Sequence, residues 1–491
     1  MMAVAAVHGL AVTGRAVARA FVGRGYAVRV ADDAPTGEHT RFAEGIGATV
    51  HDVSDAGSIA AFLEGVDVLV PAPGVPPHSA VIVAAIAAGI PVRSEIDIAY
   101  EWEQSRAHGG RPILGVTGTD GKTTTTMIAA HLLRSAGLRA EEVGNTDIPF
   151  MAAVDDDSVD VFVVECSSFR LQFTDAFRCH AAVWLNFAPD HLDWHPDLDH
   201  YRSAKERVWA HARTTDVAVA PFADPSIVGA AGRSGARVVT FGLDHGEYRV
   251  DSDRLVGPGG SLCAVPMMWR SMPHDITNSL AAAALVLESG LVPVASIAAG
   301  LSSFVPARHR IELVGSFGGS DWYDDSKATS PHAALTAIRS FDRLVLIAGG
   351  RNKGLDLSEL AAEPARMHGV VAMGDDAEAV AAAFDVTQRE ALQARILMSH
   401  QDLLVGERSS KREEAERQRA RELVREIEHE WAGLIKAATT ARRRRKDDQI
   451  VLARLMLGMI NSVWRWYRPE GAHSLEEISG VVVDSCARLI D

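Results

Sequence analysis

A glycine-rich loop followed by Lys-Thr carries the clearest chemical signal in the sequence. It extends from Ile113 to Thr126, with an apolar strand expected before it and a helix after it. Gly118 and Gly121 allow backbone N–H groups to approach phosphate oxygens without a Cβ in the way. Lys122 can reach the terminal phosphates as a point charge, and the Thr123 hydroxyl can bind Mg²⁺. The loop therefore predicts nucleoside triphosphate binding, although its glycine spacing differs from the strict Walker A pattern.

Two later strands end beside side chains that bind hard metal ions. Glu165 ends an apolar strand, and His191 lies in the loop that follows the next strand. Both would stand at strand carboxyl ends beside the phosphate loop, which predicts a Mg²⁺ site there. The alternatives are a helix-capping acid for Glu165 and, for His191, an ion pair with Asp190 or Asp193.

The elements at the start of the chain must position a second site. Residues 3–7 and 27–31 are expected to be strands, with a glycine turn at 9–14, a helix at 15–24, and Asp32 after the second strand. This order is typical of a dinucleotide-type fold, but the glycines do not form GxGxxG, so a nicotinamide cofactor is not indicated. The turn either holds a nucleotide diphosphate at a helix N-terminus or is a plain βαβ turn.

The length and net charge of the chain limit the classes of protein to which it can belong. The chain has 491 residues, of which 47% are hydrophobic, which is enough for several domains with large cores. The formal net charge of −15 disfavours phosphodiester backbones, so we expect no nucleic-acid partner. Four widely spaced cysteines without a CxxC pair indicate a reducing compartment. No apolar run reaches the roughly 18 residues of a membrane span, so we expect a cytoplasmic protein without a membrane partner.

The composition changes abruptly near residues 386–388. Upstream, glycine and proline punctuate the sequence, whereas residues 388–491 are rich in charge and contain a single proline, Pro469. In this downstream part, apolar residues recur at helical spacing, as in Leu423, Ile427 and Trp431. We therefore predict an α/β protein followed by an all-α tail.

Taken in chain order, the chemical blocks resemble those of the Mur ligases and folylpolyglutamate synthases, which are ATP-dependent amide-forming enzymes. After the phosphate loop these blocks lie at 144–145, 165–171, 186–195, 201–205, 274–278, 308–310, 324–329 and 349–353. The Ser-Ser-Phe block at 167–169 and the Asp-Ser-Lys-Ala-Thr block at 325–329 most resemble the branch that adds D-glutamate to UDP-N-acetylmuramoyl-L-alanine in peptidoglycan synthesis. The resemblance covers roughly residues 4–386.

The resemblance implies a reaction in which ATP phosphorylates the substrate carboxylate and an amine then attacks the acyl phosphate, with Mg²⁺ as cofactor. The implied catalytic residues are Lys122, His191, Lys205 and Lys327. The implied ATP contacts are Gly118, Thr119, Gly121, Lys122, Thr123, Thr124, Asn278, Arg310 and Asp325. The implied metal ligands are Thr123, Glu165, His191 and Lys205. The implied substrate contacts are Leu10, Thr13, Asp32, Asn145, Ser167, Lys327, Thr329 and Lys353.

Lys205 can serve as a metal ligand only after chemical modification. The resemblance implies a carbamylated lysine, which requires addition of CO₂ to a neutral amine and therefore a lowered pKa from burial or nearby cations. The alternative, the commoner fate of a lysine in a helix, is a solvated side chain.

Five positions depart from the D-glutamate-adding pattern. Asp120 stands where asparagine is usual, and Arg170 stands where glutamine is usual. The other three departures are Ala72, Asp275 and Ser330. None removes a phosphate or metal ligand, but together they leave open a related ligase with a different amino-acid acceptor.

The implied architecture is that of a three-domain Mur ligase with a helical tail. The boundaries are 1–104 for a Rossmann-like UDP-sugar domain, 105–303 for a P-loop-type ATP domain, 304–387 for a truncated Rossmann-like ligase domain and 388–491 for the tail. The polar stretch 105–111 is expected to be a hinge. In the third domain, strands are expected near 322–324, 344–348 and 370–373, a remnant that would leave a sheet edge uncovered unless the tail packs over it.

The tail resembles the C-terminal half of TetR-family regulators, which forms a ligand pocket and a dimer face. The DNA-reading half is missing, so we expect no repressor, and dimerisation through the tail is one option. Three interpretations follow: a D-glutamate ligase with an unusual tail, a nucleotide-binding ligase remnant joined to a dimerising or ligand-binding module, or a fusion without a selected joint function. The shortened third domain distinguishes the first two interpretations, because a ligase remnant would bind ATP without turning over the substrates.

Overall fold

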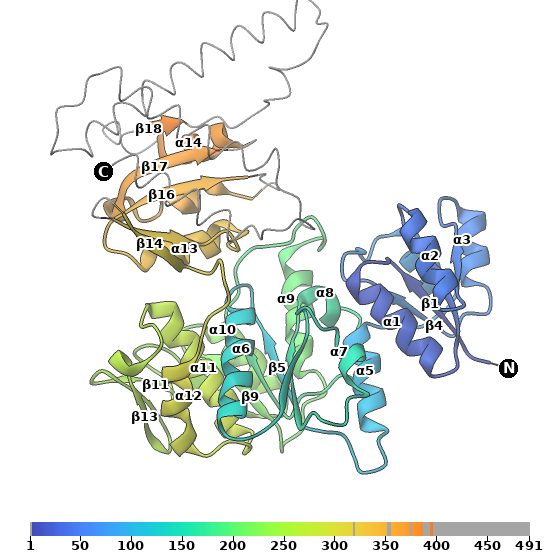
Figure 1. The fold of residues 1–491 in the computed structure, drawn as a ribbon, viewed down its shortest axis with the longest axis horizontal. Coiled ribbons are helices and arrows are strands. Elements are labelled where there is room, and N and C mark those ends of the chain that lie inside the picture. The colour runs from blue at the N-terminus through green and yellow to red at the C-terminus, as the bar shows by residue number, and fades with distance from the viewer. Residues whose placement is uncertain (1, 318–319, 351–354, 374–375, 386–392, 396–491) are drawn as a thin grey trace, which may run out of the picture. The chain divides into compact units, whose positions relative to one another are not determined.

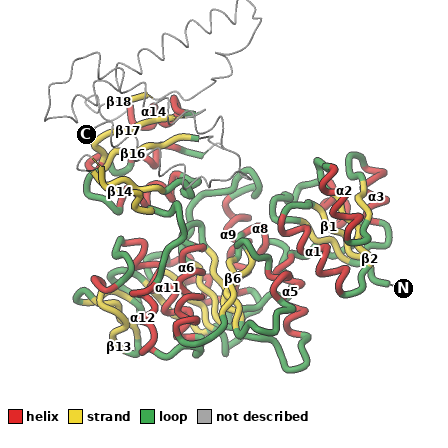
Figure 2. Tube along the Cα trace, in the orientation of Figure 1, coloured by secondary structure: helices red, strands yellow, loops and turns green. Residues whose placement is uncertain are grey.

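The computed structural model describes residues 2–317, 320–350, 355–373, 376–385 and 393–395 (Figure 1). The chain divides into two compact units, residues 1–307 and 308–491. Each unit contains a parallel sheet with helices packed on it, which confirms the predicted α/β class (Figure 2). The predicted all-α tail lies outside the described residues, apart from residues 393–395.

The first unit opens with a four-stranded parallel sheet in the order β3-β2-β1-β4. Its strands are β1 (Val4–His8), β2 (Ala27–Ala31), β3 (Thr49–His51) and β4 (Val68–Pro71). Its helices are α1 (Val12–Gly23) and α2 (Gly37–Gly45) on one face and α3 (Ala56–Leu63) and α4 (Ala80–Ala87) on the other. Parallel strands need such crossover helices, which explains why the sheet is buried on both faces.

A six-stranded parallel sheet in the order β10-β9-β8-β5-β7-β6 follows in the same unit. Its strands are β5 (Ile113–Thr117), β6 (Ala140–Gly144), β7 (Val161–Glu165), β8 (Ala181–Trp184), β9 (Val217–Pro221) and β10 (Arg237–Phe241). On one face lie α6 (Lys122–Ser135), α11 (Pro273–Glu288) and α12 (Ile297–Ser303), and on the other lie α10 (Pro225–Arg233) and η1 (Arg207–Trp209). Because the strands are parallel, the loops after β5, β7 and β8 meet at one edge, where such sheets bind ligands.

Shorter elements complete the first unit. They are α7 (Phe150–Ala153), α8 (Ser168–Leu171), α9 (Leu198–Glu206), η2 (Val265–Met267), η3 (Val294–Ser296) and the antiparallel strands β11 (Arg249–Asp251), β12 (Arg254–Gly257) and β13 (Gly260–Ala264). Leu255, Leu262 and Cys263 of this antiparallel sheet are buried in the same hydrophobic cluster as α11 and α12. The small sheet therefore extends the core on that side.

Helix α5 (Glu95–Gln104) is anchored by a buried carboxylate. Asp97 is fully buried and pairs with Arg93. Its oxygens accept hydrogen bonds from the backbone N–H groups of Asp175 (2.9 Å), Ala176 (2.8 Å) and Phe177 (2.7 Å). A carboxylate that satisfies three amides and a guanidinium ties the helix firmly to the loop after α8.

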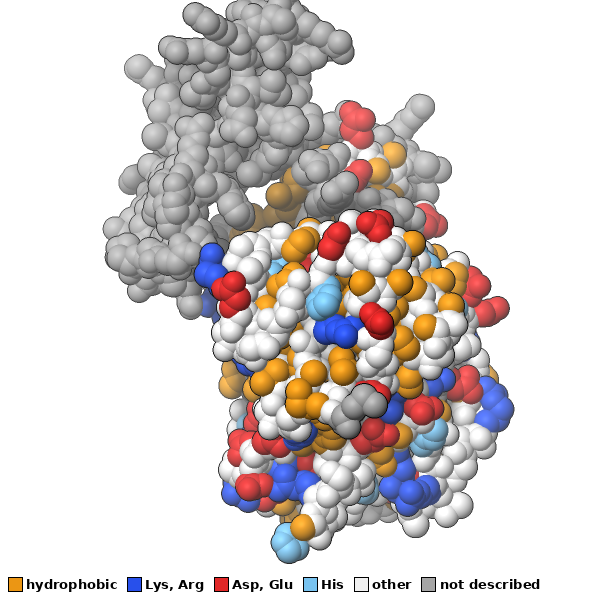
Figure 3. Space-filling view, turned by 90° about the vertical axis from the view of Figure 1, so that its right-hand side faces the viewer, with side chains coloured by type: hydrophobic (Ala, Val, Ile, Leu, Met, Phe, Trp, Pro, Cys, Tyr) orange, Lys and Arg blue, Asp and Glu red, His pale blue; other side chains and the backbone are white. Residues whose placement is uncertain are grey.

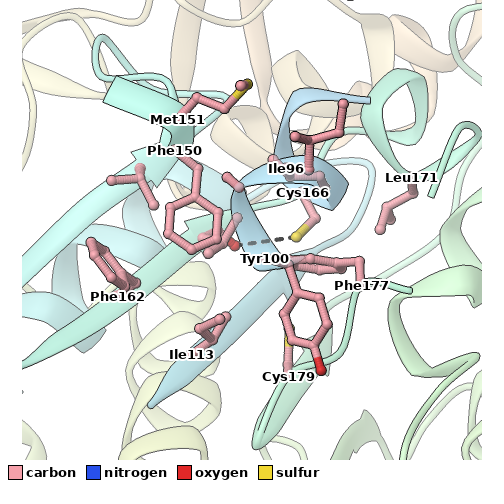
Figure 4. Close-up of a cluster of buried hydrophobic side chains, with 14 of the residues drawn as sticks. Ile96, Tyr100, Ile113, Phe150, Met151, Phe162, Cys166, Leu171, Phe177 and Cys179 are labelled. Carbon is pink, nitrogen blue, oxygen red and sulfur yellow. Dashed lines mark hydrogen bonds between the residues drawn. The ribbon is translucent and has the colours of Figure 1, made fainter. Parts of the chain in front are cut away.

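The hydrophobic cluster beside α5 joins this helix to the central sheet (Figure 4). Tyr100 of α5 packs edge-on against Phe177, with ring centroids 6.0 Å apart. Cys166 and Cys179 are also buried here, and the Cys166 thiol donates to the Val164 carbonyl (3.4 Å). Burial raises the pKa of both thiols, so they remain protonated members of the core.

The stretch 105–111, expected to be a hinge, is bonded to the last turn of α5 through Arg111. Arg111 donates from its backbone N–H and Nε to Glu103 Oε1 (2.8 Å each) and from Nη2 to Oε2 (2.7 Å). Glu103 is fully buried, so Arg111 forms a bidentate pair with a buried acid. The hinge itself stays a prediction.

The second unit contains a hairpin and a small parallel sheet. The hairpin is formed by β14 (Glu312–Phe317) and β15 (Ser320–Asp324), and the sheet by β16 (Leu344–Gly349), β17 (Met367–Met373) and β18 (Gln393–Arg395). Its helices are α13 (Pro331–Arg339), η4 (Leu357–Ala361), η5 (Pro364–Arg366) and α14 (Ala377–Asp385). The strand expected near 322–324 lies in the hairpin rather than in the sheet, since antiparallel neighbours need only a short connection. β18 lies in the segment predicted to be helical, where it pairs with β17.

One face of this small sheet carries exposed apolar side chains. Val345 and Ile347 of β16 are about half exposed, at 53% and 51%. Ala348 and Val370 instead pack against the buried cluster of α14. The helices among the described residues therefore cover one face of β16 and leave the other exposed.

No helix in the described ranges is long and apolar enough to cross a membrane. On the face of the molecule in Figure 3, acidic and basic side chains lie among hydrophobic ones. The described residues on that face therefore form no broad patch of one sign.

Replacing Asp97 with Ala should lower the free energy of unfolding by about 3–5 kcal/mol, because three backbone amides lose their acceptor and Arg93 keeps only its pair with Glu101. Thermal or denaturant unfolding measures the change. Asp160→Ala is the matched control, since that carboxylate pairs with Arg139 at the surface and its loss should change the melting temperature far less. Equal effects of the two substitutions would contradict the anchoring role of Asp97.

Candidate functional site

The phosphate loop between β5 and α6 is held in shape by Asn186, which lies two residues beyond β8. Asn186 Oδ1 accepts hydrogen bonds from the backbone N–H groups of Thr119 (3.0 Å) and Asp120 (2.9 Å). Its Nδ2 donates to the Asp120 carbonyl (3.1 Å). One amide side chain thus bonds the backbone of two adjacent loop residues, so the shape of the loop depends on the segment that follows the neighbouring strand.

Two lysine ammonium groups converge on the carbonyl of Gly118. Lys122 Nζ donates to Gly118 O (2.9 Å) and Thr119 O (2.5 Å), and Lys205 Nζ donates to Gly118 O (2.6 Å). Lys205 is 1% exposed and forms no salt bridge with the described residues. Its burial, and then the charge of Lys122, lower the pKa of Lys205 well below its usual value. The charge of Lys122 therefore favours an anionic ligand at the loop, while the lowered pKa of Lys205 favours its neutral amine.

Thr119 supports the loop through its side chain. Its hydroxyl lies 3.2 Å from the Tyr201 hydroxyl and accepts a hydrogen bond from the Ala188 backbone N–H (3.0 Å). Tyr201 is buried, and its ring lies 4.5 Å from Lys205 Nζ. The hydroxyl of Thr119, a predicted ATP contact, is therefore bonded within the protein, and so are its backbone N–H and carbonyl.

Gly121 begins α6 in a left-handed conformation, with φ of 80°. A Cβ at this position would lie 2.7 Å from Asn278 Oδ1, so both the backbone and the space require glycine. Asn278, the predicted adenine contact on α11, therefore lies directly against the loop. Thr123 and Thr124 lie in the first turn of α6.

Glu165 at the end of β7 has the properties expected of a metal ligand. Its Oε1 accepts a hydrogen bond from Asn145 Nδ2 (2.8 Å). Its Oε2 is buried and has no hydrogen-bond partner in the described part of the chain. An unsatisfied buried carboxylate oxygen is costly, and a divalent cation would satisfy it. The residues present therefore fit the predicted Mg²⁺, and the helix-capping alternative for Glu165 gains no support.

His191 combines a metal-binding side chain with a strained backbone. Its φ is 55°, and its Nε2 lies 3.4 Å from Asp190 Oδ2, so the contact with Asp190 that was considered as an alternative is present. Burial lowers the pKa of His191; the Asp190 carboxylate opposes this shift, and the charges of Lys122 and Lys205 add to it. A neutral imidazole is the form that binds metals.

The predicted sugar-nucleotide residues meet at the end of β1. The Asp32 carboxylate accepts hydrogen bonds from the backbone N–H groups of Leu10 (2.7 Å) and Ala34 (3.0 Å). Burial raises the pKa of Asp32, but these two bonds outweigh it and the net shift is downward. Thr13 lies in the first turn of α1. The structure therefore brings Leu10, Thr13 and Asp32 to one end of the first sheet.

Arg170, a departure from the expected pattern, connects this region to the central sheet. Its Nη2 donates to Thr13 Oγ1 (3.0 Å), its Nη1 to Asn145 Oδ1 (2.8 Å) and its Nε to Glu95 Oε1 (3.0 Å). Ser167, predicted to contact substrate, caps α8 by accepting from the Arg170 backbone N–H (3.4 Å). Thr13 and Asn145, both predicted to contact substrate, therefore both accept hydrogen bonds from the buried Arg170 guanidinium.

The second unit holds the remaining predicted residues. Asp325 Oδ1 accepts a hydrogen bond from the Ile311 backbone N–H (3.1 Å), next to Arg310. Lys327 donates its backbone N–H to the His309 carbonyl (3.2 Å), and Thr329 follows two residues later. Lys353 lies outside the described residues.

A His309, Glu312 and Asp324 cluster also lies in the second unit, with potential ligand atoms within 4.8 Å of one another. His309 Nδ1 is 2.6 Å from Asp324 Oδ2, and its backbone N–H donates to Glu312 Oε2 (2.7 Å). These hydrogen bonds among the three residues explain why their side chains lie together.

Some residues of the site were not assigned roles from the sequence. Asn186 and Tyr201 lie in recognised blocks, yet their support of the phosphate loop depends on contacts between distant strands and helices. Glu95 gave no chemical signal at all, because an acid at the start of a helix is ordinary. Only its burial, at 1% exposure, distinguishes it.

Comparison with known proteins identifies the family. Residues 116–286 match the family described as Mur ligase middle domain. The UDP-N-acetylmuramoylalanine–D-glutamate ligase of Frankia casuarinae is 39% identical over 388 residues, which is 77% of this chain and 80% of that protein. The enzyme of the same name from Thermobifida fusca is 37% identical over 398 residues, covering 77% of this chain and 84% of that protein. This chain belongs to the Mur ligase family.

Solved structures of Mur ligases share the fold. UDP-N-acetylmuramate-alanine ligase MurC from Thermotoga maritima has a TM-score of 0.50 and 19% identity, covering 84% of this chain and 94% of that chain. MurF from Acinetobacter baumannii has a TM-score of 0.50 and 19% identity, covering 77% and 79%. Within the tail, residues 389–490 match a different family, described as Tetracyclin repressor-like, C-terminal domain.

Replacing Asn186 with Ala should weaken ATP binding about tenfold or more, because two loop N–H groups lose their acceptor and a carbonyl loses its donor. Isothermal titration calorimetry with ATP measures this, and the melting temperature reports any general loss of stability. Thr240→Ala is the control, since it removes a hydroxyl on β10 that accepts a hydrogen bond from the Glu247 backbone N–H. Unchanged ATP affinity in a folded Asn186→Ala protein would show that the loop keeps its shape without this side chain.

Proposed function

We propose that this chain is an ATP-dependent ligase that joins the carboxylate of UDP-N-acetylmuramoyl-L-alanine to the amine of D-glutamate in peptidoglycan precursor synthesis. The observation that carries the proposal is the glycine loop in which Lys122 and the buried Lys205 meet at the Gly118 carbonyl. The charge of Lys122 suits the polyphosphate of ATP, and the lowered pKa of Lys205 suits its conversion to a metal-binding carbamate. Because ATP and a UDP-sugar are soluble metabolites, we place the activity in the cytoplasm.

The chemistry consists of two balanced steps. A substrate carboxylate oxygen attacks the γ-phosphorus of ATP, the bond to the β-phosphate oxygen breaks, and ADP leaves. The amine nitrogen then attacks the acyl carbon, phosphate leaves, and the nitrogen loses a proton as the amide forms. Lys122, whose Nζ lies on the carbonyls of Gly118 and Thr119 in the loop, would hold the phosphates and neutralise part of their charge.

Magnesium is the cofactor that the site residues fit. Glu165, His191, the Thr123 hydroxyl and a carbamylated Lys205 would hold it, and it would neutralise the charge of the phosphates. We assign Gly118, Thr119, Gly121, Thr124 and Asn278 to ATP. We assign Leu10, Thr13, Asp32, Asn145 and Ser167 to the UDP-linked substrate.

The second unit would supply the remaining contacts. We assign Arg310 and Asp325 to ATP, and Lys327, Thr329 and Lys353 to D-glutamate or the transferred phosphoryl group, with Lys327 catalytic. A dianionic amino acid suits such a basic set. The domain boundaries that correspond to these roles are 1–104, 105–303, 304–387 and 388–491.

A second candidate is a nucleotide-binding protein that no longer ligates. It is favoured by the match of residues 389–490 to an unrelated family, which begins where the ligase resemblance ends. Such a protein would retain the loop, Lys122 and Lys205 but would lack acceptor-dependent turnover.

Purified protein with ATP, Mg²⁺ and UDP-N-acetylmuramoyl-L-alanine should release ADP when D-glutamate is added, and Lys122→Ala should reduce the rate at least about 100-fold by removing a cation from the phosphates. A coupled ADP assay measures both. Arg139→Ala is the control, since this side chain pairs with Asp160 at the surface. ATP binding without D-glutamate-dependent ADP release would reject the ligase and leave the second candidate.

Lys205 should form a carbamate with dissolved CO₂. The neutral amine attacks the carbon of CO₂ and loses a proton, and the lowered pKa of Lys205 should allow this at a lower pH than for an exposed lysine. Carbon-13 NMR with labelled bicarbonate would show one protein-bound carbamate signal. The signal should be absent from Lys205→Arg. A fully active protein without that signal would show that Lys205 works unmodified.

A further inference from the structure

Arg170 is a buried cation whose three hydrogen-bond acceptors come from three separate parts of the first unit. It is 4% exposed and bonds Glu95 of α5, Asn145 after β6 and Thr13 of α1. Glu95 is 1% exposed, and its other oxygen accepts from the Met151 backbone N–H (3.2 Å). The ion pair is therefore fully enclosed and bonded, which makes its geometry specific.

The guanidinium determines which way the Asn145 amide faces. Arginine has only donors, so the group that Asn145 presents to it must be the oxygen, Oδ1. The Asn145 Nδ2 is then left to donate to Glu165 Oε1 at 2.8 Å. A glutamine at position 170, usual in the D-glutamate-adding pattern, has both a donor and an acceptor and would not impose this orientation.

The orientation of the Asn145 amide in turn affects the carboxylate of Glu165. With Oε1 occupied by Asn145, the carboxylate is fixed in rotation and its buried Oε2 is left without a partner in the described chain. Hydrogen bonds to the other atoms of a metal ligand orient that ligand and tune its affinity. The chain Arg170–Asn145–Glu165 thus has the form of such a support.

We propose that Arg170 is a positioning residue that fixes Asn145 and, through it, orients Glu165 toward a divalent metal ion, while its bond to Thr13 ties the first sheet to the same support. The inference rests on the proposed function in taking the ion to be the one that accompanies ATP. Arg170 itself touches no ion and acts through Asn145.

The test measures metal binding without turnover. Mn²⁺ affinity is determined by electron paramagnetic resonance in the presence of a non-hydrolysable ATP analogue. Arg170→Gln leaves Glu95 buried and unpaired, so it should lower the melting temperature, and the double variant Glu95→Gln/Arg170→Gln should recover most of that loss. Both variants should bind Mn²⁺ about tenfold or more weakly, because the Asn145 amide is no longer oriented.

A matched control separates orientation from stability. Arg178 and Asp216 form another buried bidentate pair of this unit, and Arg178→Gln/Asp216→Asn should leave Mn²⁺ affinity unchanged. If the Arg170 variants fail to fold, Asn145→Ala keeps the Arg170–Glu95 pair and should weaken Mn²⁺ binding equally.

Two results would overturn the proposal: a folded Glu95→Gln/Arg170→Gln protein with wild-type Mn²⁺ affinity, or wild-type protein that binds no Mn²⁺. Failure of the proposed function looks different, because the wild type would then bind Mn²⁺ and nucleotide without D-glutamate-dependent ADP release. In that case a weakened Mn²⁺ affinity in the Arg170 variants would still support the positioning role.

Discussion

Two lysine side chains that meet at one carbonyl oxygen are the constraint around which the first unit is arranged. Lys122 and Lys205 both donate to Gly118 O, and Lys205 is buried without an acidic side chain in salt-bridge contact among the described residues. Burial and the charge of Lys122 lower the pKa of Lys205, which favours its neutral amine. Asn186 and the Thr119–Tyr201 contact hold the backbone beneath the two side chains from β8 and α9. The charge of Lys122 at this loop suits an anionic ligand.

The buried acids of the first unit differ from these lysines, because each buried carboxylate outside the site has hydrogen-bond partners for its oxygens. Asp97 satisfies three amides and Arg93, while Glu103 satisfies Arg111. Glu165 is the exception, with one buried oxygen that no described group contacts. Buried polar networks are stable when complete. A carboxylate that lacks a hydrogen-bond partner at the carboxyl end of a central strand therefore indicates a position where a ligand binds. This agrees with the metal-binding side chains predicted beside Glu165.

Local chemistry could be predicted from the sequence where adjacent residues carry it, and long-range contacts could not. The loop around Lys122 and the strand end at Glu165 were found because strand, glycine and cation follow one another. Arg170 was noticed only as a departure, since its partners are far away in sequence. The pairing of Arg111 with the buried Glu103 was not predicted, because polarity does not reveal whether a charge faces water or a buried partner. The hairpin of β15 was missed because strand pattern alone does not say which neighbour a strand pairs with.

The reactivity of two buried thiols reports how often the fold opens around them. Cys166 follows Glu165 directly, and Cys179 lies so close to β5 that a Cβ on Gly115 would approach its sulfur to 2.7 Å. Both thiols are enclosed and held protonated, so a reagent that modifies thiolates reaches them only when the sheet beneath the phosphate loop separates. Their rate of alkylation in the native protein thus reports the frequency of that separation. A ligand that braces the loop would make these cysteines slower to react.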